Sequence, residues 1–123
     1  MIRLVGGLIL AWIFVTGLGL EARADPSSDL VQTGRTLFES RCFVCHGRTG
    51  QGNGPAAVGL NPPPADFTKP TWQAGISDPD LMRVIKDGGS ALGRSPLMPP
   101  NGDLNERQIE ALIAFVRSLK SQN

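Results

Sequence analysis

Apolar residues recur at three- and four-residue steps in three stretches of the chain, which is the period of an amphipathic helix. Ser28 or Asp29 can cap the first stretch, and Asn105 can cap the last, with Gln108 placed to complete a capping box. The middle stretch starts at Ser77 to Asp80, where serine, proline and acid take typical first-turn positions, and two glycines end it. The pattern therefore predicts an all-α domain with three main helices.

One face of each stretch carries its apolar residues. They are Leu30, Val31, Gly34, Leu37, Phe38 and Cys42 in the first, Leu81, Val84 and Ile85 in the second, and Ile109, Leu112, Ile113, Val116 and Leu119 in the third, with Phe115 alongside. Glycine inside a helix costs about 1 kcal/mol relative to alanine. Since Gly34 lies on the apolar face, we expect a second helix to cross closely there.

Two segments between the expected helices are rich in glycine and proline. Gly47 to Pro64 holds four glycines before Pro55 and a run of three prolines at its end, and Ser90 to Asp103 holds three more prolines. Such a composition supports neither helix nor strand. We expect both segments to be loops, and the first to be ordered rather than a flexible linker.

The N-terminus predicts export. A short basic start precedes an apolar stretch over residues 4–20, and Ala22 and Ala24 occupy the two positions that a signal peptidase reads. We expect residues 1–24 to be a cleaved signal peptide and residues 25–123 to be one domain. An uncleaved membrane anchor is the alternative, and it is the one case in which we expect a membrane association. Both interpretations place the domain in the periplasm.

Charge excludes one class of partner. Removing Arg3, Arg23 and Glu21 with the leader leaves ten Lys/Arg and ten Asp/Glu. No basic stripe is present, so we do not expect nucleic acid binding.

A monomeric domain of this size buries only about 60–65% of its unfolded surface, and a large apolar cofactor would complete its core.

The two cysteines and the single histidine of the chain fall together in Cys42-Phe43-Val44-Cys45-His46. C-x-x-C-H is the attachment motif of c-type haem. Two thiols one helical turn apart add to the two vinyl groups of the porphyrin, and the imidazole of His46 then lies under the iron as an axial ligand. The motif predicts one haem c attached through Cys42 and Cys45.

Three other kinds of site can contain a C-x-x-C motif. A structural zinc site needs four protein ligands, and no second Cys or His pair is present. A thioredoxin-like dithiol follows a strand and precedes a helix, whereas here a helix precedes and a loop follows. A plain disulfide leaves the adjacent histidine unexplained.

Elimination points to the sixth iron ligand. No second histidine is available, and outside the leader the methionines are Met82 and Met98. Met98 lies in a loop stiffened by prolines on both sides, whereas Met82 lies on a short helix that packs into the core. We therefore expect His46 and Met98 to ligate the iron. Lysine ligation or an open site remains the alternative.

The order of these features resembles the class I c-type cytochromes, in particular small bacterial monohaem proteins. The resemblance rests on a G-x-x-x-F helix, the C-x-x-C-H motif, a Gly-Pro loop, a short helix, P-L-M-P-P-N and a C-terminal helix, and it covers residues 29–121. It implies the cytochrome c fold, in which the first and last helices cross and Gly34 and Phe38 meet Phe115.

The resemblance also implies roles for three further residues. The carbonyl of Pro55 is expected to accept a hydrogen bond from the ring N–H of His46. Asn101 is expected to donate toward the thioether sulfur, and the indole of Trp72 toward a haem propionate, although Trp72 can also be a packing residue. The segment from Gly54 to Phe67 resembles cytochrome subunits that serve dehydrogenases and oxidases.

The expected function is one-electron transfer between periplasmic dehydrogenases and a terminal oxidase or reductase, with a redox protein as donor and another as acceptor. The sequence shows no second cluster of titratable residues, so we do not expect a stand-alone enzyme. Two alternatives stay open: a haem subunit permanently docked on a redox complex, and a gas sensor or peroxidase-like protein with an open sixth site.

Overall fold

The structure is a computed structural model that describes residues 25–120. Within that range it is all-helical, as predicted, and contains no strand. The elements in chain order are α1 (Pro26–Arg41), α2 (Phe43–His46), α3 (Pro70–Ala74), α4 (Asp78–Asp87), the 3-10 helix η1 (Gly89–Leu92) and α5 (Glu106–Ser118). The predicted signal peptide or anchor falls on residues 1–24 and lies outside the described residues. None of the helices between residues 25 and 120 has the length and apolar character that a bilayer crossing needs.

Helix α1 begins earlier than predicted. Its N-cap is Asp25, whose carboxylate accepts hydrogen bonds from the Ser27 backbone N–H (3.1 Å) and hydroxyl (2.7 Å). Pro26 takes the first helical position, where its missing N–H costs nothing. The expected caps at Ser28 and Asp29 were wrong: Asp25 caps a helix as well as either of them, and the proline after it is pre-organised for the first helical position.

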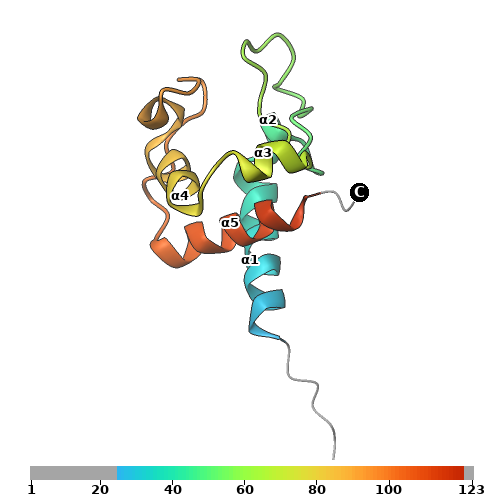
Figure 1. Ribbon diagram of the computed structural model, residues 1–123, viewed down its shortest axis with the longest axis vertical. Helices are drawn as coiled ribbons and strands as arrows, with labels where there is room; N and C mark the ends of the chain where they lie inside the picture. The colour runs from blue at the N-terminus through green and yellow to red at the C-terminus, as the bar shows by residue number, and fades with distance from the viewer. Residues whose placement is uncertain (1–24, 121–123) are drawn as a thin grey trace, which may run out of the picture.

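Helices α1 and α5 pack against each other at Gly34, as predicted. A Cβ atom on Gly34 would overlap the backbone carbonyl of Ala111 and lie 2.9 Å from the Cβ of Phe115. Phe38 is 1% exposed, and its ring centroid lies 5.1 Å from that of Phe115. The absence of a side chain at Gly34 lets the two backbones approach, and α5 runs across α1 in Figure 1.

The predicted starts of the other long helices are confirmed. Ser77 caps α4 and accepts a hydrogen bond from the backbone N–H of Asp80 at 3.2 Å. Gly88, with a φ of 86°, ends it. Asn105 and Gln108 form the complete capping box of α5, with bonds of 2.9 and 3.0 Å.

Three short elements were not predicted: α2, α3 and η1. Each has only four or five residues, too few to show a helical period. Helix α2 contains most of the C-x-x-C-H motif and is separated from α1 by Cys42, whose ψ is still helical but whose φ has opened to −107°.

Two loops complete the fold. The Gly/Pro loop (residues 47–69) joins α2 to α3, and the methionine loop (residues 93–105) joins η1 to α5. Residues 47–64 contain no helix or strand, as predicted. In Figure 1 the green Gly/Pro loop and the orange methionine loop extend from the same side of α5, one at each end of that helix. The core beneath them is a single cluster of buried side chains: Phe38, Phe67, Ile76, Leu81, Val84, Ile85, Leu104, Ile109, Leu112, Ile113, Phe115 and Val116.

A candidate haem site

The C-x-x-C-H motif forms one compact helical turn. The backbone N–H groups of Cys45 and His46 both donate to the carbonyl of Cys42, at 3.2 and 2.9 Å. Both cysteines are free thiols and half-buried. The turn places the two thiols on neighbouring positions of one helix, which is the arrangement that attachment to two vinyl groups needs.

One nitrogen of the His46 ring is already engaged. Its Nδ1 lies 3.2 Å from the carbonyl oxygen of Ala65, which can only accept, so Nδ1 carries the proton. The other nitrogen, Nε2, then has its lone pair free for a metal. A hydrogen bond of this kind fixes the tautomer and raises the basicity of a ligating imidazole.

The hydrogen-bond acceptor of the His46 ring differs from the one expected. Pro55 was predicted to accept this hydrogen bond, and Ala65 holds the position instead. The first part of the Gly/Pro loop packs along the motif and is hydrogen-bonded to it. The backbone N–H of Gly54 donates to the Cys45 carbonyl at 3.0 Å, and that of Ala56 donates to the Val44 carbonyl at 2.8 Å. This leaves Pro55 exposed, and the returning end of the loop brings Ala65 to the ring.

The protonation states suit ligation rather than redox exchange at sulfur. Burial lowers the pKa of His46 from 6.5, and the hydrogen bond to Ala65 opposes that shift. The ring is therefore neutral at pH 7, as a metal ligand must be. Burial raises the pKa of Cys42 to about 11, whereas the attacking thiol of a thioredoxin-like dithiol has a lowered pKa.

The zinc alternative gains no support from the fold. Residues 25–120 contain no group of three or more His, Cys, Asp and Glu side chains arranged to hold a metal ion. Closing a zinc site around this motif would need a further ligand from elsewhere in the fold.

Aromatic side chains cover His46 from the returning loop. The ring of Phe67 stacks on the imidazole, with centroids 4.4 Å apart and planes 19° from parallel. Phe67 also contacts Trp72 at 4.7 Å and the edge of Phe38 at 6.1 Å. Neither Phe67 nor Ala65 was predicted as a site residue. Both lie beyond the proline run, and no local pattern marks the point where the loop returns to the motif.

Trp72 provides the test of whether the site fits a haem. Its indole Nε1 is buried and is the only buried side-chain nitrogen or oxygen in residues 25–120 without a hydrogen-bond partner. A buried N–H left unpaired costs about 1–3 kcal/mol, so such groups normally have an acceptor. A haem propionate is a suitable acceptor, and Trp72 is joined to His46 through Phe67. The residues present therefore fit the group.

Met98 lies in the methionine loop, half-buried against the core. Its carbonyl accepts from the backbone N–H of Gly89 at 3.0 Å, and its own N–H donates to Ser95 at 3.3 Å. A Cβ on Gly89 would overlap the carbonyl of Ser95, so this glycine permits the close approach of loop and η1. Met82 is also half-buried and packs against the same core from α4.

Asn101 serves the loop rather than a sulfur atom. Its side-chain nitrogen donates to the carbonyl of Ile85 at 3.1 Å and approaches that of Pro99 at 3.5 Å. Its backbone N–H also donates to Ile85 and Lys86. No hydrogen bond within residues 25–120 joins Asn101 to the Met98 sulfur, so the role implied by the resemblance was wrong for this structure. Asn101 instead ties the methionine loop to the end of α4.

The site residues thus form two groups. Cys42, Cys45, His46 and Trp72 are linked through contacts on the side of the Gly/Pro loop. Met98 and Asn101 belong to the methionine loop on the other side of the molecule (Figure 1). A flat group attached at the motif would be flanked by these two loops.

Comparison with known proteins agrees with this geometry. A family model described as Cytochrome c matches residues 31–120. The chain is 30% identical over 90 residues to cytochrome c-554(547) of Halothiobacillus neapolitanus, a match that covers 71% of this chain and 93% of that protein. It also aligns with the solved structure named KustC0563 c-type cytochrome, with a TM-score of 0.56 and 26% identity over 72% of this chain and 98% of the other.

Two further relatives are longer proteins. Cytochrome c oxidase subunit 2 of Alkalihalophilus pseudofirmus is 36% identical over 116 residues, and the cytochrome bc1 complex cytochrome c subunit of Mycobacterium tuberculosis is 28% identical over 129 residues. These matches cover 89% and 94% of this chain but only 31% and 41% of the relatives. The family model, the shared fold and the C-x-x-C-H turn lead to one conclusion: the chain belongs to the cytochrome c family and is a small class I c-type cytochrome.

Proposed function

We propose that this protein transfers single electrons through one haem c attached at Cys42 and Cys45, with His46 and Met98 as its axial ligands. The observation that carries the proposal is the His46 ring, whose Nδ1–H is directed to Ala65 so that Nε2 is free for iron. When bound, the haem supplies a one-electron couple between two oxidation states of iron. His46 and Met98 would hold the iron in both states, and burial and hydrogen bonds to these residues would set the potential.

Met98 is the proposed sixth ligand because its loop is held on both sides. The backbone bond from Gly89 and the Asn101 bonds to the end of α4 restrict the loop. A thioether is a weak ligand and must be presented rigidly to compete with water. Ligation by His and Met favours a raised potential, which suits passing electrons from dehydrogenases toward a terminal oxidase or reductase.

Location and partners extend the proposal. The predicted leader supports the periplasm, where covalent haem attachment takes place in bacteria. The names of the relatives, an oxidase subunit and a bc1 complex subunit, support redox proteins as donor and acceptor. The same names favour a second candidate, a subunit docked permanently on such a complex. Size-exclusion chromatography of native periplasm separates the two: a free carrier elutes as a monomer, and a docked subunit elutes with its complex.

A redox titration of the purified protein tests the proposed function. We expect one haem spectrum that interconverts between two forms with the slope of a one-electron couple, and no carbon monoxide binding to the reduced protein at neutral pH. Rapid binding of carbon monoxide would identify an open sixth site and favour the gas sensor or peroxidase-like alternative.

A further inference from the structure

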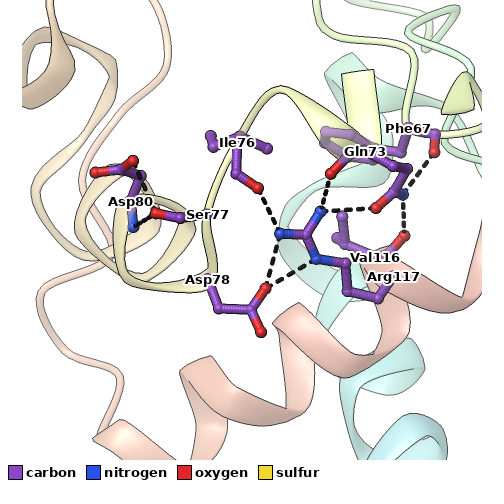
Figure 2. A network of polar contacts seen from close by, with 8 residues as sticks. All are labelled: Phe67, Gln73, Ile76, Ser77, Asp78, Asp80, Val116 and Arg117. Atoms are coloured by element: carbon purple, nitrogen blue, oxygen red, sulfur yellow. Dashed lines mark hydrogen bonds and ion pairs between the residues drawn. The ribbon is translucent and has the colours of Figure 1, made fainter. Parts of the chain in front are cut away.

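Arg117, in the last turn of α5, donates four hydrogen bonds and forms an ion pair with Asp78 (Figure 2). Nη1 donates to the backbone carbonyl and the side-chain oxygen of Gln73, at 2.8 and 2.9 Å. Nη2 donates to the Ile76 carbonyl at 2.6 Å, and Nε and Nη2 both contact the carboxylate of Asp78, at 2.8 and 2.7 Å. All of these acceptors belong to residues 73–78, so one side chain fixes the end of α3 and the start of α4.

Gln73 extends these contacts inward. It is 7% exposed and is the only buried polar side chain in the described part of the chain. Its Nε2 donates to the carbonyl of Phe67 at 2.7 Å and to that of Val116 at 2.8 Å, while its oxygen accepts from Arg117. The nitrogen and the oxygen of the Gln73 amide therefore both have hydrogen-bond partners. Gln73 thereby links the backbone of Phe67 to α5.

Phe67 connects this network to the iron ligand. Its ring stacks on the imidazole of His46 at 4.4 Å. Helix α3 cannot hold the arrangement alone, because it has five residues and no side-chain cap, and helices this short are unstable without tertiary contacts. Within residues 25–120, the only other hydrogen bond of the Phe67 backbone is from its N–H to the Gly50 carbonyl, at 2.7 Å.

We infer that Arg117 is a positioning residue for the haem ligand: through Gln73 and Phe67 it sets the orientation of the His46 ring. The inference rests on the proposed haem site and goes beyond it, since no ligand or attachment residue lies in the network. Arg117 differs from a typical surface arginine because its guanidinium donates four hydrogen bonds to one segment, a geometry that lysine cannot reproduce.

The test compares Arg117→Met with Arg41→Met in the haem-loaded protein. Arg41 makes a matched two-bond contact with Asp103, at 2.9 and 2.6 Å, and is nearer to His46 in sequence but makes no hydrogen bond or ion pair with residues 67–78. Proton NMR of the oxidised protein reports the orientation of the His46 ring through its iron-shifted resonances, and a redox titration reports the potential. We expect both to shift in Arg117→Met, and the His46 resonances to stay at wild-type values in Arg41→Met. The resonances decide the comparison, because the charge of Arg41 acts on the attachment residue Cys42 and its loss can change the potential directly.

The pathway is tested by combining Arg117→Met with Phe67→Leu. If Phe67 carries the effect, the Arg117 substitution produces no further shift of the His46 resonances in the Phe67→Leu background. Arg117→Lys, which retains the charge with fewer donors, gives an intermediate shift and replaces Arg117→Met in the test if that variant does not fold.

A lower melting temperature with unchanged His46 resonances and unchanged potential overturns the inference, as does an equal shift of these resonances in Arg41→Met. Wild-type protein without iron-shifted resonances would instead refute the proposed haem site.

Discussion

At the scale of single residues, the site depends on which polar atoms already have a hydrogen-bond partner in the protein and which have none. His46 uses Nδ1 on the Ala65 carbonyl and keeps Nε2, and the indole Nε1 of Trp72 is buried without a hydrogen-bond partner in residues 25–120. Both groups suit a haem: Nε2 of His46 as an iron ligand, and the indole N–H of Trp72 as a donor to a propionate. The two methionines are less clearly separated, because both are half-buried against the same core.

Substitution separates the two methionines. Met98→Ala should remove the weak far-red absorption band that arises from sulfur bonded to oxidised iron, open the iron to added ligands, and lower the potential, because water favours reduced iron less than a thioether does. The haem should stay attached. Met82→Leu conserves volume, so it should keep the band and change the free energy of unfolding by less than about 1.5 kcal/mol. The reverse pattern would assign the ligand to Met82.

At the scale of elements, the fold is organised by the contact between α1 and α5. Local sequence signals predicted both helices and a close crossing at Gly34, because a period of three to four residues and a glycine on the apolar face act within one helix. That α5 is the crossing helix was implied by the resemblance to class I c-type cytochromes. The same signals failed for α3, for the Ala65 contact and for the Arg117 network. These depend on residues that are 19 to 44 positions apart in the chain, and no local pattern encodes where such a loop returns.

Gly34→Ala tests the helix contact. Alanine is the better helix former by about 1 kcal/mol, yet its methyl group would overlap the Ala111 carbonyl. We expect a net loss of about 1–3 kcal/mol in the free energy of unfolding, measured by denaturant titration. Gln32→Ala, at an exposed position of the same helix, is the control and should stay within about 0.5 kcal/mol of wild type. Equal stability of Gly34→Ala and wild type would show that the helices can separate without cost.

At the scale of the whole molecule, the surface suggests how partners are met. Large exposed apolar side chains in the described residues are Val44 in the motif, Val58 in the Gly/Pro loop and Leu97 beside Met98, with exposed fractions of 42%, 89% and 57%. All three belong to the segments that would flank the haem. Since Lys/Arg and Asp/Glu are balanced after residue 24, we expect apolar contact rather than charge to govern docking.

Val58→Lys tests this docking surface. Loss of one apolar contact of about 1.5 kcal/mol should slow electron transfer to the native partner about tenfold, with the absorption spectrum unchanged. Gln32→Lys adds the same charge on α1 and should have no effect.

Stopped-flow rates of electron transfer, measured over a range of salt concentrations, should vary little for wild-type protein. A steep fall with salt would show a charged docking face.

The central claim, covalent attachment of one haem at Cys42 and Cys45, is tested most directly by the pyridine haemochrome spectrum of the denatured, reduced protein. This spectrum distinguishes haem with two thioether bonds from haem with one or none. We predict a two-bond spectrum for wild type and a one-bond spectrum, at lower yield, for both Cys42→Ala and Cys45→Ala. Haem that is extracted from the denatured wild-type protein by acid and acetone, leaving a chain without a haemochrome band, would contradict the account.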